Sequence, residues 1–348
     1  MYLDFFKLIE PPFLLTPDPR FLYLSKAHSR AITFMEYAIL NRDGFAVITG
    51  EIGSGKTTLI SKLLTGLDED TLIARIYHTH VDSVEFFRAL LDEFGIHEHG
   101  DNKVALLGQI NTFLLEAFSE NKKVILIVDE AQNLSEKLLE EIRLLTDLET
   151  NNEKLMNLIL VGQPELNETL DQPQLEQLTQ RIRFRCHIGA LNDKEMGEYI
   201  QHRLTVAGLE KEVFTKQAMP SLFKYTGGIP RLINALCDVA LICAYAEDSH
   251  RVNNKIVQIA VNELEWKPFN ERYKDIDQDA INRKLARNTD NKQLGIIEEK
   301  INKFISTQER HVDEMKHLLM RLEVKIEAYE DKLTSLNKEV KTINTKLR

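Results

Sequence analysis

The segment "VITGEIGSGKTTL" at residues 47–59 constrains the fold of this chain more than any other part of the sequence. It follows the spacing G-x-x-x-x-G-K-[ST], whose fixed positions are here Gly50, Gly55, Lys56 and Thr57. An apolar run precedes it and an apolar helical pattern follows it, so the motif lies at a strand-to-helix turn. A loop of this kind turns its backbone N–H groups towards phosphates at the positive end of a helix. The alternative is a chance match by a glycine-rich loop, and the flanking strand and helix argue against it.

The predicted ligand of this loop is a nucleoside triphosphate, ATP, bound together with Mg²⁺. We expect Lys56 to place its charge at the β- and γ-phosphates and the Thr57 hydroxyl to ligate Mg²⁺. The glycines allow the backbone to curl around the phosphates. The predicted nucleotide-binding residues are Gly50, Glu51, Ile52, Gly53, Ser54, Gly55, Lys56, Thr57 and Thr58.

Apolar runs alternate with helical patterns on both sides of the phosphate loop. Strands that alternate with helices indicate an α/β fold with a doubly wound parallel sheet. From residue 192 onward the strand signals stop and helical patterns follow, which predicts a small all-helical lid. After the run that ends at Ile48, the predicted strands are 71–77, 123–129, 156–162 and 183–191.

The predicted organisation of the chain has five parts. A proline-rich lead-in is followed by a helix that Ser25 is expected to cap, and Asn192 is expected to cap the first lid helix. Pro230 suits the first turn of a later lid helix. The parts are a lead-in at 1–43, a nucleotide-binding α/β domain at 44–191, a helical lid at 192–266, a linker at 267–293 and a coiled coil at 294–348.

The tail carries a heptad pattern. From Ile301 to Leu347 the core positions alternate in spacings of four and three, and only Gln308 among them is polar. This regular period of 3.5 residues predicts a left-handed coiled coil, through which the chain either self-associates or holds a protein partner. The alternative is an amphipathic helix that lies on the core.

Composition narrows the class of protein. The net charge is −10, and residues 1–265 carry 26 Lys and Arg against 39 Asp and Glu. This balance argues against a broad nucleic-acid-binding surface and leaves a local basic patch open. The sequence lacks an apolar run of about 18 residues, a signal-peptide pattern and C-x-x-C spacing among its three cysteines. We therefore expect a cytoplasmic protein with buried, reduced cysteines and with neither a membrane span nor a zinc site.

The segment "VILIVDEAQ" at residues 124–132 supplies two acids at the end of an apolar strand. Asp129 is expected to hold Mg²⁺ through water, and Glu130 to orient and polarise an attacking water. The two acids come after the phosphate loop in the chain, the order that a nucleotide hydrolase requires. The alternative is that they only cap the next helix.

Further polar residues are candidates for contacts with the γ-phosphate. Gln163 follows the next strand and is expected beside the attacking water; the alternative is an ordinary turn residue. Arg181 is expected to reach the γ-phosphate in a neighbouring subunit, and Arg183 and Arg185 are rival candidates or solvated residues. Arg231, early in a lid helix, is expected to face the phosphates and couple the lid to the nucleotide; the alternative is a surface arginine.

The ordered motifs resemble AAA+ ATPases of the ExeA/GspA general-secretion type, especially the versions associated with exosortase and exopolysaccharide gene clusters in bacteria. The motifs are "TPDPRFLYLS", "GEIGSGKTT", "VDEAQNL", "LVGQPEL", "LTQRI" and "GGIPRLIN", and they cover roughly residues 1–265. The resemblance implies an AAA+ base with a helical lid, ATP hydrolysis at subunit interfaces and ring-like homo-oligomers. It implies Walker A roles for Lys56 and Thr57, Walker B roles for Asp129 and Glu130, sensor roles for Gln163 and Arg231, and an arginine-finger role for Arg181.

Together these observations predict an ATPase that drives assembly or remodelling in envelope secretion or polysaccharide export. It would be free in the cytoplasm or peripheral to the inner membrane. The secretion members join their ATPase through a membrane span to a peptidoglycan-binding part, whereas this sequence has the predicted coiled coil after its lid. A DNA-binding regulator of the transposition-ATPase type is the first alternative, which the acidic composition disfavours. A scaffold that binds ATP and turns it over slowly is the second, which the presence of Glu130 disfavours.

Overall fold

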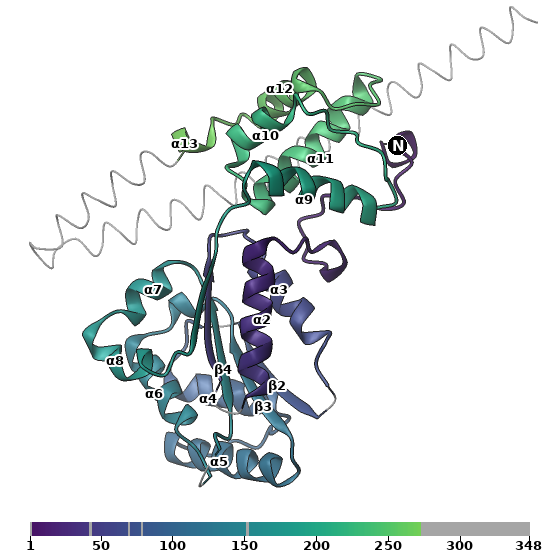
Figure 1. Ribbon diagram of the computed structural model, residues 1–348. Helices are drawn as coiled ribbons and strands as arrows, with labels where there is room; N and C mark the ends of the chain where they lie inside the picture. The colour runs from purple at the N-terminus through teal and green to yellow at the C-terminus, as the bar shows by residue number, and fades with distance from the viewer. Residues whose placement is uncertain (1, 42–43, 69, 78, 151–152, 273–348) are drawn as a thin grey trace, which may run out of the picture. The chain divides into compact units, whose positions relative to one another are not determined.

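The computed structural model describes residues 2–41, 44–68, 70–77, 79–150 and 153–272 (Figure 1). The chain divides into two units, residues 1–274 and 275–348, and the fold given below is that of the first unit. The predicted coiled coil at 294–348 and most of the predicted linker at 267–293 lie outside the described residues.

A five-stranded parallel sheet forms the base of the first unit. Its order is β2-β3-β4-β1-β5, so β1 lies between two strands that follow much later in the sequence. Nearly every residue of β1, β3 and β4 is buried, as expected for parallel strands that are covered on both faces. This confirms the predicted doubly wound α/β fold. The strands are β1 (Phe45–Gly50), β2 (Thr71–Ile76), β3 (Lys123–Val128), β4 (Asn157–Gly162) and β5 (Phe184–Ile188).

Two helical layers cover the sheet (Figure 1). Alternate strand residues point to opposite faces, so Ile125 packs with α2 and α3 whereas Val124 packs with the helices of the other face. The first layer is α2 (Lys26–Leu40) and α3 (Lys56–Leu64). The second contains α4 (Ser83–Glu93), α5 (Lys103–Ser119), α6 (Glu136–Thr146), α7 (Glu165–Leu170), η3 (Pro173–Leu175) and α8 (Glu176–Thr179).

Side-chain caps fix where several helices begin. The Ser25 hydroxyl accepts a hydrogen bond from the His28 amide, which confirms the predicted cap of α2. Asp82 and Glu85 form a reciprocal capping box at the start of α4, and so each satisfies a backbone donor that the helix leaves open.

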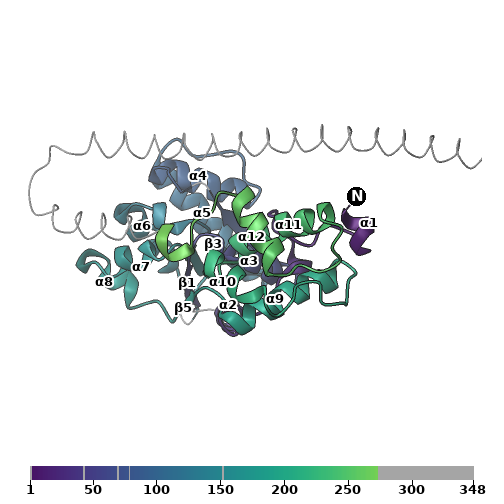
Figure 2. The ribbon, with the colours of Figure 1, turned by 90° about the horizontal axis from the view of Figure 1, so that it is seen from above.

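The helices that follow β5 form the lid, shown gathered together in Figure 2. Asn192 caps its first helix and Pro230 occupies the first turn of a later one, both as predicted. The four longer helices each bury one apolar face in a core that is separate from those of the sheet, whereas the last and shortest helix has no buried residue. The helices are α9 (Asp193–Val206), α10 (Met219–Thr226), α11 (Pro230–Ala246), α12 (Asn254–Glu263) and the short α13 (Phe269–Arg272).

The N-terminal segment, residues 2–21, belongs to the lid core. It contains α1 (Tyr2–Phe6) and η1 (Pro19–Phe21), and it places Phe6, Phe13 and Phe21 among the buried residues of the lid. The predicted lead-in at 1–43 is thus divided, because its proline-rich first part belongs to the lid core whereas α2 packs on the sheet. The α/β base lies between the two sequence segments that build that lid.

Cys186, Cys237 and Cys243 are free and buried, as the sequence predicts. Burial raises the pKa of the Cys243 thiol to about 11, which keeps it protonated near neutral pH. Within the described ranges, no helix is long and apolar enough to cross a membrane.

Candidate nucleotide-binding site

The phosphate loop between β1 and α3 depends on two glycines in the left-handed region. Gly53 has φ of +80° and Gly55 has φ of +99°. Residues that carry a Cβ atom adopt such left-handed backbone angles only at a cost of roughly 1–2 kcal/mol. At Gly53 a Cβ atom would also lie 2.5 Å from Cβ of Arg231, so only glycine lets the lid approach the loop this closely. The loop therefore has the curled backbone that the sequence predicts.

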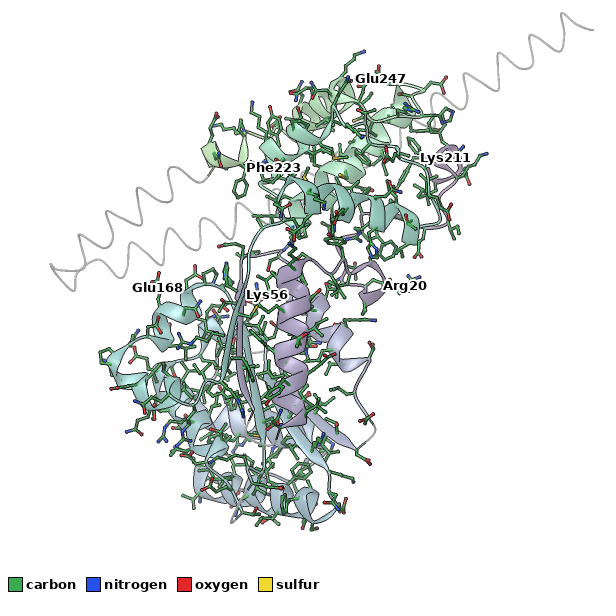
Figure 3. The ribbon with its side chains drawn as sticks, in the orientation of Figure 1. Arg20, Lys56, Glu168, Lys211, Phe223 and Glu247 are labelled. Atoms are coloured by element: carbon green, nitrogen blue, oxygen red, sulfur yellow. The ribbon has the colours of Figure 1, made fainter. Side chains whose placement is uncertain are left out.

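Lys56 lies at the carboxyl end of the sheet and is nearly buried (Figure 3). Its ammonium donates hydrogen bonds to the carbonyl oxygens of Gly50, at 2.7 Å, and Glu51, at 3.1 Å. Burial lowers the pKa of Lys56 below its ordinary value, while the carboxylates of Glu130 and Asp129 raise it. The Lys56 ammonium is thus hydrogen-bonded to carbonyl oxygens of its own loop. A charged phosphate oxygen would be a stronger acceptor for these hydrogen bonds.

The two predicted Mg²⁺ ligands are in direct contact. Thr57 Oγ1, in the first turn of α3, donates to Oδ2 of Asp129 across 3.3 Å. Asp129 follows β3 and is only 2% exposed. A hydroxyl and a buried carboxylate are oxygen ligands of the type that Mg²⁺ prefers, so this pair fits the predicted ion.

Arg75 on β2 shares the same carboxylate oxygen. Its Nη2 atom lies 3.3 Å from Oδ2 of Asp129, and its guanidinium stacks over the ring of Tyr77 at 4.3 Å. The sequence analysis did not single out Arg75. The only available signal was a charged residue inside the otherwise apolar run "TLIARIY".

Glu130 begins the short η2 helix (Ala131–Asn133) and has left-handed backbone geometry, with φ of +53°. Its side chain makes no capping hydrogen bond, which argues against a role as an ordinary helix cap. Instead, Oε2 of Glu130 accepts from Nε2 of Gln132 at 2.7 Å and from Nε2 of Gln163 at 3.3 Å. The structure therefore brings Gln163 to the carboxylate with which it was predicted to act.

A pocket of about 400 Å³ opens beside the phosphate loop. The backbone N–H of Arg231 donates to the carbonyl of Gly53 at 3.2 Å, which joins the start of α11 to the loop. The walls come from the phosphate loop, the N-terminal segment and the lid. Lining residues include Leu14, Thr16, Phe21, Tyr23, His28, Gly53, Lys56, Thr57, Glu130, Gln163, Tyr199, Arg203 and Arg231.

The three arginines around β5 lie outside this pocket. Arg181 contacts Asp147, and its pKa is lowered first by burial and then by the charge of Arg143. Arg183 stacks over the ring of Tyr37 at 5.4 Å, and Arg185 pairs with Asp171 at 2.8 Å. Among the described residues that line the pocket, none is one of these three arginines.

Residues 39–170 match the model of the AAA domain family. This segment belongs to that family. The matched segment contains the phosphate loop and both predicted Walker B acids, so the chain carries the AAA domain of an ATPase, as the sequence predicts.

The chain is also similar to the general secretion pathway protein A of Aeromonas hydrophila, with 41% identity over 265 residues. This alignment covers 76% of the chain, and the chain spans about half, 48%, of that relative. The resemblance to the ExeA/GspA type is thereby confirmed.

Solved structures share the fold at low sequence identity. The Drosophila ORC bound to DNA matches with a TM-score of 0.58 and 17% identity, over 76% of this chain and 66% of that one. The ADP form of the Aeropyrum pernix ORC2 protein matches with a TM-score of 0.54 and 17% identity, over 72% of each chain. These likenesses support the AAA+ architecture of base and lid.

Around the AAA domain, the structure reveals two residues that sequence reasoning missed. His28 of α2 is buried, and its Nε2 lies 3.0 Å from the carbonyl oxygen of Ser54 in the phosphate loop, while Ser25 Oγ holds Nδ1 at 2.7 Å. Arg203 of α9 donates to the carbonyl of Pro12 at 2.5 Å and so ties the N-terminal segment to the lid. Both side chains line the pocket, and only the tertiary fold brings them there.

Proposed function

We propose that this protein binds ATP with Mg²⁺ in the pocket of its AAA domain and hydrolyses it at interfaces between subunits. The observation that carries the proposal is the convergence of Lys56, Thr57, Asp129 and Glu130 at the carboxyl end of one sheet. These residues come from a loop and helix after β1 and from the end of β3. Their types and positions are those that phosphoryl transfer to water needs.

In this proposal Lys56 binds the β- and γ-phosphates once its loop carbonyls release it. Thr57 would ligate Mg²⁺ and Asp129 would hold it through water, and the bound ion would supply charge neutralisation for the phosphates. Glu130 orients the attacking water and accepts its proton. Gln163, hydrogen-bonded to Glu130, lies on the side of the pocket where the γ-phosphate is expected.

Two arginines extend the proposed site beyond the phosphate loop. Arg231 couples the lid to the nucleotide, because its helix begins in contact with the loop carbonyl of Gly53. Arg181 acts as the finger that stabilises γ-phosphate charge in a neighbouring subunit. Its partial exposure and its position outside the pocket of its own chain support a role in trans.

The cellular role proposed here is assembly or remodelling of a bacterial envelope system, either secretion or exopolysaccharide export. The support is the 41% identity to a general secretion pathway protein. The chain would work as a ring-like homo-oligomer in the cytoplasm or at the periphery of the inner membrane. The predicted coiled coil at 294–348 would hold the protein partner.

A DNA-binding regulator is the second candidate. It is favoured by the fold shared with the Drosophila ORC, a protein whose structure was solved bound to DNA. The excess of 39 acidic over 26 basic residues within 1–265 disfavours it. Steady-state ATPase rates with and without duplex DNA at low salt separate the two, because phosphate contacts are strongest there. Several-fold stimulation would favour the regulator, and an unchanged rate would favour a protein partner.

The direct test of the proposed chemistry compares three proteins. The wild-type protein should hydrolyse ATP only when Mg²⁺ is present. The Lys56→Ala variant should lose nucleotide binding. The Glu130→Gln variant should bind ATP but turn it over at least 100-fold more slowly than wild type. Loss of binding in Glu130→Gln would contradict the role given to that carboxylate. Absence of ATP hydrolysis by the wild-type oligomer would overturn the proposal.

Mixing two inactive variants tests the shared site. Lys56→Ala lacks the phosphate lysine and Arg181→Ala lacks the proposed finger, so each homo-oligomer should be inactive. In mixed oligomers some interfaces combine an intact Lys56 with an intact Arg181 from the next subunit. Recovery of activity on mixing supports the trans role, whereas its absence in proven mixed oligomers contradicts it. Arg183→Ala and Arg185→Ala serve as matched comparisons.

A further inference from the structure

Gln132, the last residue of "VDEAQ", connects the two polar residues beside the γ-phosphate position. Its Nε2 donates to Oε2 of Glu130 at 2.7 Å, and its Oε1 accepts from the backbone N–H of Gln163 at 2.9 Å. The Gln163 side chain closes the triangle by donating to the same Glu130 oxygen at 3.3 Å. One amide thus links the end of β3 to the end of β4.

The orientation of this amide follows from hydrogen-bonding chemistry. The backbone N–H of Gln163 is only a donor, so the atom of Gln132 that faces it must be the carbonyl oxygen. The NH₂ group must then face Glu130, which as a carboxylate only accepts. If the amide were flipped, its NH₂ group would face the backbone N–H of Gln163, and its oxygen would face the carboxylate of Glu130.

The neighbouring backbone is shaped to admit Gln132. At Gly162, a Cβ atom would lie 2.9 Å from Oε1 of Gln132 and 3.2 Å from its backbone nitrogen. The backbone of Glu130 is held in its left-handed conformation by Thr79, whose hydroxyl donates to the Glu130 carbonyl at 3.0 Å. Backbone and side chain of Glu130 are therefore both fixed.

We propose that Gln132 is a positioning residue for ATP hydrolysis, which aims the Glu130 carboxylate at the attacking water. Within the described chain, the hydrogen bonds to this carboxylate fall on Oε2. In the proposed arrangement, Oε1 is the oxygen that accepts the proton of the attacking water. Gln132 does not touch the nucleotide in this scheme but acts through Glu130 and keeps it in register with Gln163. The inference rests on the proposed ATPase function.

Two substitutions at Gln132 test its two hydrogen bonds, the one that its NH₂ group donates and the one that its oxygen accepts. Gln132→Leu removes both hydrogen bonds at similar side-chain size. Gln132→Glu keeps an acceptor for the Gln163 amide, loses the donor to Glu130 and places a second negative charge beside it. Both variants should lower kcat by roughly 10- to 100-fold while the Kd for ATP changes less than about threefold, since a positioning defect appears in turnover.

Gln109 provides a matched control. Its amide also accepts from a backbone N–H, of Gly100 at 2.8 Å, and donates to a backbone carbonyl, of Glu98 at 2.7 Å. It lies on α5, away from the nucleotide pocket. Gln109→Leu should lower stability as Gln132→Leu does and leave kcat unchanged. Equal kcat values for both leucine variants would overturn the proposal.

A double-substitution cycle shows whether Gln132 acts through Glu130. Single-turnover hydrolysis of bound ATP measures the residual rate of Glu130→Gln, alone and with Gln132→Leu added. If Gln132 only positions Glu130, the second substitution should change this residual rate less than twofold. An additional loss as large as that in the wild-type background would show an independent role. An active wild type with fully active Gln132 variants refutes this inference alone, whereas an inactive wild type refutes the proposed function.

Discussion

The guanidinium of Arg75 lies 3.3 Å from Oδ2 of Asp129, and the two side chains are only 12% and 2% exposed. A permanent positive charge thus lies against the carboxylate that is proposed to hold Mg²⁺. Thr57 donates to the same oxygen. The charge of Asp129 is therefore balanced within the protein itself, and a bound cation would share this carboxylate with an arginine.

Arg75→Met should leave Asp129 buried without its cation. Removing one partner of a buried ion pair costs about 3 kcal/mol or more of unfolding free energy, measured by urea denaturation. Mg²⁺ with a non-hydrolysable ATP analogue should recover part of this loss, because it supplies positive charge at the same oxygen. Lys194→Met is the control, since Lys194 is 86% exposed where it pairs with Glu198, and should have no measurable effect. Equal stability of the two variants would show that the Arg75 pair contributes nothing.

His28 should make the folded state sensitive to acid. Burial lowers the pKa of His28 in the folded protein below the ordinary value of 6.5, so the unfolded chain binds its proton first. The stabilisation from neutral His28 is complete above about pH 6.5 and is lost as the pH falls below that value. Unfolding free energies at several pH values should therefore fall more steeply for wild type than for His28→Gln. Parallel curves would contradict the lowered pKa.

Arg203 should hold the N-terminal segment on the lid. It donates to the carbonyls of Pro12, at 2.5 Å, and Leu14, at 3.3 Å, and its guanidinium stacks over Phe21 at 4.9 Å. Arg203→Met should lower the unfolding free energy by about 3 kcal/mol, since hydrogen bonds to charged groups are strong. Limited proteolysis should then cut within residues 2–21 before the rest of the chain.

Arg251 is exposed and serves as the control for the Arg203→Met experiments. The Arg251→Met variant should have the same unfolding free energy and the same proteolytic cleavage pattern as wild type. Protection of the N-terminal segment in Arg203→Met equal to that of wild type would show that the apolar contacts of Phe6, Phe13 and Phe21 suffice.

Gly53→Ala should open the phosphate loop. The added methyl group meets a left-handed backbone and lies 2.5 Å from Cβ of Arg231, so either the loop or the start of α11 must move. Titration with a fluorescent ATP analogue should show at least a tenfold weaker Kd, which corresponds to about 1.4 kcal/mol.

Gly108→Ala is the comparison for Gly53→Ala. Gly108 lies within α5, and a Cβ atom there meets no other atom within 4 Å. Alanine should stabilise this helix by about 0.5–1 kcal/mol and leave nucleotide binding unchanged. Similar effects of the two substitutions would show that Gly53 has no special role in the loop.

Much of the base could be predicted because its signals are local in sequence. The phosphate-loop spacing, the apolar strands and the caps at Ser25 and Asn192 each depend on residues close together in the chain. The parallel sheet follows from the alternation of strands and helices. Asp129, Glu130 and Gln163 each follow a predicted strand, and Thr57 lies at the start of the helix after another strand, which places all four at the carboxyl end of the parallel sheet. There the structure joins Thr57 to Asp129 and Gln163 to Glu130.

The contacts that were missed are those between distant segments. Arg75 appeared as one charge in an apolar strand, and no local pattern indicates that its side chain reaches Asp129. His28 reaches the phosphate loop because α2 packs beside α3. Gln132 was part of a quoted motif, but its position relative to Gln163 depends on how closely η2 approaches the end of β4.

The split construction of the lid has a consequence for synthesis on the ribosome. Arg203 binds the carbonyl of Pro12, which lies 191 positions earlier in the chain. At translation rates of about 5–20 residues per second, this interval lasts roughly 10–40 s. Phe6, Phe13 and Phe21 are made before α9–α12 and lack these partners until the whole α/β base has been made. These apolar residues, although made before the base, can therefore be buried only after the base is complete.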